Sequence, residues 1–194
     1  MRKSEIKRKT KETDIQLTLN LDGKGKYDID TGIGFFDHMM ELFSKHALFD
    51  LDLKIRGDLN VDEHHTVEDA GIVFGEAFKT ALGDKKGIKR YATVFLPMDE
   101  ALAMVSVDIS GRPYCVFDAS FEEKKAGGTS AQVYEECIRA LAVNAGVTLH
   151  VRILYGSNTH HMIEAVFKGL ARALREAAAF DPREKGVPST KGLL

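Results

Sequence analysis

The chain has 194 residues, of which 44% are hydrophobic, and a formal net charge of −2. A chain of this length and composition can bury a core without disulfides, which excludes a disordered protein. The near-neutral charge excludes the basic field typical of nucleic-acid binders, so we expect no nucleic-acid partner. The apolar runs are far shorter than the roughly 20 residues of a membrane span, so we expect no membrane partner either.

The first half of the chain predicts the order strand, strand, helix, strand, helix. Apolar residues alternate over 15–21 and again over 51–55, with the two-residue period of a half-buried strand. Turn residues at 22–25 lead into a short strand at 27–29, so we expect the first two strands to form a hairpin. Apolar residues spaced three and four apart predict helices over 35–47 and 67–81, the second ending near Gly83.

The second half is predicted to repeat this order. We expect strands at 104–109, 114–119 and 147–153, with helices at about 130–145 and 159–179. The pattern His-His-x-x-Glu occurs at 64–68 and again at 160–164, an offset of 96 positions, and each copy begins a helix after a strand. This recurrence indicates an internal duplication. We therefore predict an α+β fold in a single domain, residues 1–194, built from two ββαβα half-domains at about 1–92 and 93–194.

The cysteines and the first residues indicate the compartment. Cys115 and Cys137 are the only cysteines, and they form neither a Cys-x-x-Cys pair nor a disulfide framework. We interpret both as ordinary buried thiols. The first fourteen residues contain no apolar segment typical of a secretory signal. We therefore expect a cytoplasmic protein.

Each His-His-x-x-Glu copy places possible metal ligands on one turn of helix. His64 and Glu68 lie on the same face, whereas His65 points about 100° round the helix, so each copy can serve two metals. Imidazole and carboxylate without thiolate suit Mn, Fe or Zn. One copy alone would be typical of a polar helix start, but its recurrence favours a metal site. The order of ligands differs from the zinc-protease signature and from the Glu-x-x-His pattern of di-iron bundles.

The two copies belong to a set of seven segments that run in order along nearly the whole chain. These segments are residues 8–13, 31–39, 62–69, 98–102, 110–114, 160–165 and 188–192. Together they resemble the imidazoleglycerol-phosphate dehydratase family of histidine biosynthesis. The resemblance implies a hydro-lyase that converts a small phosphate ester, D-erythro-imidazoleglycerol phosphate, to imidazoleacetol phosphate. It also implies two Mn²⁺ ions per active site and a hollow homo-oligomer of two dozen subunits with the sites at subunit interfaces.

The resemblance also implies the metal ligands. One Mn²⁺ would be held by His38, His65, Glu68 and His161, and the other by His64, His160, Glu164 and Glu136. The family more often has a histidine in place of Glu136, but a carboxylate can still bind Mn²⁺, so we expect a site of altered affinity. Leu42 stands where many relatives carry a glutamine that contacts the substrate, which removes the basis for that one contact.

The chemistry of the implied reaction requires proton transfer. The proton to be removed lies on a carbon with no adjacent carbonyl group, so an ordinary base cannot form a stabilised carbanion there. Binding of the substrate imidazole to metal would supply the driving force. The resemblance points to Glu12 as the carboxylate that transfers protons, with Asp99 and Glu164 as other candidates. It implies substrate contacts from Glu12, His38, His46, Arg90, Arg112, Lys168, Ser189, Thr190 and Lys191, whose cations suit the phosphate.

Two other functions are considered beside the dehydratase. One is a non-catalytic assembly or storage protein, in which the two His-His-x-x-Glu copies only link subunits through metal. The phosphate-binding set disfavours it, since storage has no use for Arg90, Arg112 and Lys191 close to a metal pair. The other is a metallohydrolase that uses metal-bound hydroxide on a phosphate ester. Release of free phosphate in place of the oxo product would indicate the hydrolase.

Overall fold

Alternating apolar residues build the first sheet by sharing one of its faces. β2 (Thr13–Asn20) pairs antiparallel with β4 (Asp50–Gly57), and the register places Leu17 opposite Leu53, both fully buried. β1 (Lys3–Lys9) pairs with β2 and β3 (Tyr27–Asp30) with β4, so the strand order is β1-β2-β4-β3. The structure, a computed structural model, describes residues 2–194, and residue 1 of the predicted domain lies outside them.

The predicted hairpin between the first two strands is wrong, because β4 lies between β2 and β3. β3 pairs parallel with β4, with Ile29 opposite Leu53. Asp50, at the start of β4, accepts hydrogen bonds from the backbone N–H groups of Lys24 and Lys26, which fixes the turn beside β4. β2 and β4 are 8 residues long each, whereas β3 has only 4 residues. The longer apolar pairing therefore makes β4, rather than β3, the neighbour of β2.

The second sheet has the same topology as the first. β5 (Tyr91–Met98) pairs with β6 (Ala101–Asp108), β6 pairs with β10 (Thr148–Tyr155), and β10 pairs parallel with β7 (Tyr114–Asp118). The order β5-β6-β10-β7 therefore corresponds to β1-β2-β4-β3. Each half begins with a strand, β1 or β5, that the predicted ββαβα order lacks. A short pair, β8 (Lys125–Ala126) and β9 (Thr129–Ser130), lies in the loop before α3.

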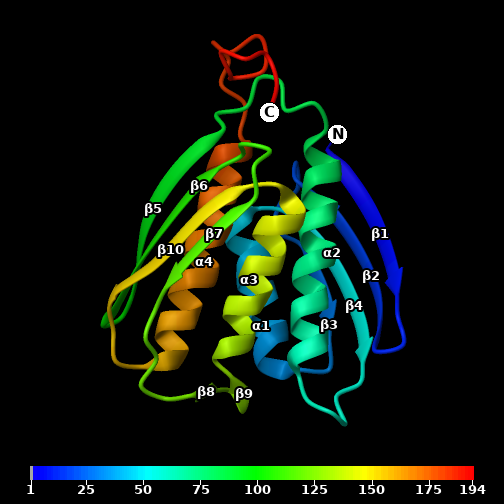
Figure 1. Cartoon of the computed structure of the whole chain (residues 1–194), viewed down its shortest axis with the longest axis vertical. Helices are drawn as coiled ribbons and strands as arrows, with labels where there is room; N and C mark the ends of the chain where they lie inside the picture. The colour runs from blue at the N-terminus through cyan, green and yellow to red at the C-terminus, as the bar shows by residue number, and fades with distance from the viewer. Residues whose placement is uncertain (1) are drawn as a thin grey trace.

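Four helices lie between the two sheets (Figure 1). They are α1 (Gly34–Ala47), α2 (His64–Leu82), α3 (Gln132–Ala145) and α4 (Thr159–Ala178). Their apolar faces and the inner faces of the sheets form one core, which confirms the predicted α+β class. α2 and α4 begin at the same end of the molecule, so both His-His-x-x-Glu copies lie there (Figure 1).

Both cysteines are free, and the predicted burial is confirmed for one of them. Cys137 is buried and Cys115 is half-buried. Burial raises the pKa of the Cys115 thiol to about 11 and that of Cys137 to about 12.

Over residues 2–194, no helix has the length and apolar character needed to cross a membrane.

Candidate active site

The start of α4 brings two possible metal ligands together with a third from α1. His38, His160 and Glu164 offer ligand atoms that all lie within 4.8 Å of one another. His160 Nε2 is 3.3 Å from Glu164 Oε2, and the Glu164 side chain is 8% exposed. Lys168, one turn further along α4, forms an ion pair with Glu164. Two imidazoles and one carboxylate are a donor set that fits a divalent ion such as Mn²⁺.

Positive charge keeps Glu164 ionised in spite of its burial. Burial alone would raise the pKa of Glu164, but the hydrogen bond from Lys168 and its charge hold this pKa below its usual range. The same cation acts on His46 of α1, whose pKa is lowered by burial and by the charges of Lys168 and Arg172. The cluster therefore offers an ionised carboxylate, and protonation of His46 is disfavoured.

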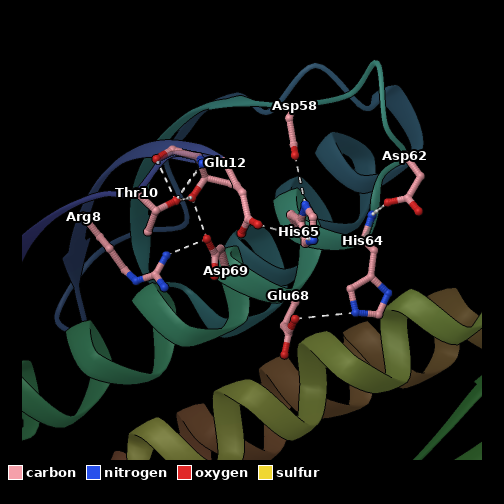
Figure 2. A network of polar contacts seen from close by, with 10 residues as sticks. Arg8, Thr10, Glu12, Asp58, Asp62, His64, His65, Glu68 and Asp69 are labelled. Atoms are coloured by element: carbon pink, nitrogen blue, oxygen red, sulfur yellow. Dashed lines mark hydrogen bonds and ion pairs between the residues drawn. The ribbon is translucent and has the colours of Figure 1, made fainter.

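The start of α2 carries the other His-His-x-x-Glu copy, residues 64–68 (Figure 2). His64 Nε2 lies 3.5 Å from Glu68 Oε2, which repeats the pairing of His160 with Glu164. His65 turns the other way: its Nδ1 is 3.0 Å from Asp58 Oδ2 and its Nε2 is 3.9 Å from Glu12 Oε1. The hydrogen bond with Asp58 raises the pKa of His65.

Glu12 reaches this position because α2 holds the turn between β1 and β2 (Figure 2). Asp69 of α2 accepts hydrogen bonds from Arg8 Nη1 and from Thr13 Oγ1, both at 2.5 Å. Thr10 Oγ1 accepts the backbone N–H of Glu12 at 3.1 Å. The carboxylate of Glu12 is thereby presented beside His65, although its side chain stays 53% exposed.

His161 of α4 has surroundings like those of His65. Its Nδ1 lies 2.7 Å from Glu100 Oε2, and its Nε2 lies 3.8 Å from Asp99 Oδ2. The hydrogen bond with His161 lowers the pKa of Glu100 to about 2. Asp99 has a φ of 48°, a left-handed backbone that a non-glycine residue adopts at a penalty. The turn between β5 and β6 therefore holds Asp99 close to a proposed metal ligand.

A pocket of about 790 Å³ at the C-terminal segment collects most of the predicted phosphate contacts. Its lining includes Arg90, Arg112, Ser189, Thr190 and Lys191. Arg90 pairs with both oxygens of Asp108, at 2.7 and 3.2 Å, and donates to the carbonyl of Pro188 at 2.8 Å. The cations and hydroxyls of this pocket suit a phosphate group.

The pocket and the histidines lie at opposite ends of α4. The backbone N–H of Arg90 donates to the carbonyl of Ala177, in the last turn of this helix, whereas His160 is in the first turn. Between these positions the helix rises about 25 Å, at about 1.5 Å per residue. Lys168, a predicted phosphate contact, lies near the histidines instead, because it forms an ion pair with Glu164. Within one chain, the pocket proposed to bind the phosphate (the anion pocket) is therefore far from the proposed metal ligands.

Glu136 is the proposed ligand that comes from α3. Glu136 is half-buried on α3, and within residues 2–194 it forms no ion pair or hydrogen bond with another proposed ligand. The cluster of His38, His160 and Glu164 combines residues that the resemblance divides between two metals. The division of ligands between two ions stays a prediction.

Four carboxylates that contact the candidate site residues are not predicted from the sequence. Asp58 and Glu100 contact the second histidine of each copy, and Asp69 and Asp108 anchor Arg8 and Arg90. Glu100 and Asp69 lie inside the segments that carry the family resemblance, which was a usable signal. Nothing in the local pattern singles out Asp58 or Asp108.

The chain is similar to imidazoleglycerol-phosphate dehydratases in sequence and in fold. The model of that family matches residues 31–174. The dehydratase of Clostridium botulinum strain Langeland is 64% identical over 191 residues, which cover 98% of this chain and 97% of the relative. The dehydratase of Acetivibrio thermocellus is 61% identical over 193 residues, which cover 100% of this chain and 99% of the relative. The crystal structure from Staphylococcus aureus superposes with a TM-score of 0.84 at 40% identity, covering 92% of this chain and 99% of that one. The crystal structure from Pyrococcus furiosus superposes with a TM-score of 0.85 at 38% sequence identity, covering 97% of this chain and 100% of that one.

Proposed function

Because this chain belongs to the imidazoleglycerol-phosphate dehydratase family, hydro-lyases of histidine biosynthesis, we propose that it dehydrates D-erythro-imidazoleglycerol phosphate with two bound Mn²⁺ ions. The observation that carries the metal requirement is the cluster of His38, His160 and the buried Glu164 at the start of α4. A buried carboxylate that stays ionised beside two imidazoles is suited to a divalent cation.

The proposed ligands are the two His-His-x-x-Glu copies with His38 and Glu136. Bound metal would favour loss of the N–H proton of the substrate imidazole and so assist departure of the neighbouring hydroxyl group. Lys168 keeps Glu164 ionised, and Asp69 holds the turn that carries Glu12. Glu12 faces His65, where its carboxylate can accept or donate a proton, and Asp99 has the equivalent position at His161.

The phosphate of the substrate would bind in the pocket lined by Arg90, Arg112 and Lys191. Arg90 uses three of its five N–H donors on Asp108 and Pro188, which leaves two for an anion. Because this pocket is remote from the histidines of the same chain, we propose that a working site takes its metal ligands and its anion pocket from different subunits. A large homo-oligomer, of two dozen subunits by resemblance to the family, supplies such interfaces.

The test is turnover of the Mn²⁺-loaded full chain with imidazoleglycerol phosphate. We expect imidazoleacetol phosphate as the product. Release of free phosphate would support the metallohydrolase instead, and no turnover with any divalent metal would exclude the lyase. We expect His65→Ala to abolish metal-dependent turnover, whereas His150→Ala, at an exposed position on β10, leaves it unchanged. Full turnover by the His65 variant would contradict the ligand assignment.

A further inference from the structure

The second histidine of each His-His-x-x-Glu copy is held by a carboxylate from outside its helix. Asp58 lies 3.0 Å from Nδ1 of His65, and Glu100 lies 2.7 Å from Nδ1 of His161. In both cases the other ring nitrogen, Nε2, faces away from this carboxylate toward the candidate proton-transfer groups, Glu12 and Asp99. Each ring therefore lies between a carboxylate at Nδ1, which we call the holding carboxylate, and a candidate proton-transfer carboxylate at Nε2.

The holding carboxylates are fixed themselves. Glu100 Oε1 accepts the backbone N–H groups of Ser157 and Asn158, at 3.1 and 2.7 Å, so the loop before α4 locks it. The Asp58 side chain is 21% exposed, and its Oδ1 is buried with no hydrogen-bond partner among residues 2–194. Keeping such an oxygen away from water is unfavourable, which is the expected penalty for aiming Oδ2 at His65.

Duplication of the chain does not explain this arrangement. Asp58 follows β4, just before α2, whereas Glu100 lies in the turn between β5 and β6, far from His161 in the chain. β10 (148–155) follows β4 (50–57) at an offset of 98 positions, which places Gly156 at the position that corresponds to Asp58, and glycine has no carboxylate. The two halves therefore reach one geometry by different routes, which indicates a requirement of the histidines themselves.

We propose that Asp58 and Glu100 are positioning residues that accept the Nδ1–H of His65 and His161 and so present Nε2 of each ring to a divalent metal. This inference rests on the proposed function, because it assigns these two histidines to metal. A carboxylate at Nδ1 fixes the tautomer and ring orientation and increases the basicity of Nε2, so its removal weakens metal binding without removing a ligand.

The experiment titrates the metal-free full chain with Mn²⁺ and measures the free ion by electron paramagnetic resonance. Asp58→Asn and Glu100→Gln keep the size of each side chain, but an amide can donate as well as accept and so no longer fixes the tautomer. We expect each variant to bind Mn²⁺ about 10- to 100-fold more weakly than the wild type. Thermal unfolding without metal checks that each variant is folded.

Matched controls separate ring positioning from loss of negative charge. Asp62→Asn changes a carboxylate in the same loop as Asp58, one that accepts the backbone N–H of His64 at 2.8 Å but contacts no ring. Glu122→Gln removes a charge from the loop after β7. Both controls should bind Mn²⁺ as the wild type does.

The outcomes distinguish the inference from the function on which it rests. Wild-type affinity in both folded test variants, or an equal loss in the controls, would overturn the positioning role alone. A wild-type chain that binds no Mn²⁺ would overturn the proposed metal site, and this inference with it.

Discussion

At the scale of single residues, Arg90 shows how one side chain serves both the fold and the anion pocket. The residue is 8% exposed, holds Asp108 through two nitrogens and donates to Pro188, next to Ser189 of the pocket. Its φ of 76° is a left-handed backbone conformation, which a non-glycine residue keeps only when its surroundings impose it. Arginine is required here because lysine is a point charge without the planar fork.

Arg90→Lys should weaken substrate binding more than it slows turnover. The variant loses the bidentate pairing with Asp108 and the anchor to Pro188, so the segment that carries Ser189 is no longer held. Charge-assisted hydrogen bonds are worth about 1.5–3 kcal/mol, so we expect KM to rise about tenfold or more with a smaller change in kcat. Steady-state kinetics against the phosphate substrate measure both.

A second arginine provides the control for this substitution. Arg183 has a side chain that is 88% exposed, and it pairs with Asp181. Arg183→Lys should therefore leave KM unchanged. An unchanged KM in Arg90→Lys as well would show that the fork of Arg90 is dispensable for the pocket.

At the scale of elements, the close approach of α2 and α3 depends on glycine. A Cβ added at Gly71 would lie 2.3 Å from the carbonyl oxygen of Cys137, and one at Gly75 would lie 2.6 Å from that of Leu141. These neighbours are backbone atoms of a helix, which cannot turn aside as a side chain can. The two glycines let α3 pack directly on the helix that carries His64 and His65.

Gly71→Ala should destabilise the protein although alanine is the better helix former. Alanine gains about 1 kcal/mol in helix propensity, but the added methyl must push two packed helices apart. Overpacking of this kind costs about 1–3 kcal/mol, and a clash with backbone belongs at the upper end, so we expect a net loss in the free energy of unfolding. Denaturant unfolding monitored by circular dichroism measures it.

Gly34→Ala is the matched control, since a Cβ at Gly34 meets no atom within 4 Å. It lies at the start of α1, where alanine should be neutral or stabilising. A Gly71 variant as stable as the Gly34 variant would contradict the close approach of α2 and α3.

Strand prediction succeeded or failed according to how the faces are buried. β2 and β4 alternate cleanly because one face meets the core and the other meets solvent. β1 was missed because it is an edge strand in which only Ser4 is buried. β5 was missed because apolar residues occupy both faces, with Phe95 60% exposed, so alternation disappears.

For the molecule as a whole, the proposal that a site is shared between subunits predicts complementation. By this proposal, Glu164→Gln would disable the metal end of the site and Arg112→Ala would disable its anion pocket. Each variant alone should be inactive or nearly so. Mixed assemblies should regain activity, because some sites combine an intact metal end from one chain with an intact pocket from another.

The measurement is activity after dissociation, mixing and reassembly of the two variants, with each variant taken through the same steps alone as the control. Light scattering confirms that mixed particles have formed. Mixed particles as inactive as the separate variants would contradict a site shared between chains.

Local residue patterns are enough to predict the α+β class and to place imidazole and carboxylate groups at two helix starts. These properties depend on residues a few positions apart, whose periodicity and spacing are visible in the chain. Local patterns do not reveal that β4 separates β2 from β3, or that Asp58 and Glu100 contact His65 and His161; the folded chain does. The fold also places the proposed anion pocket at the far end of α4 from the histidines. These arrangements join residues remote in the chain, and the packing of sheets against helices sets them rather than any local pattern.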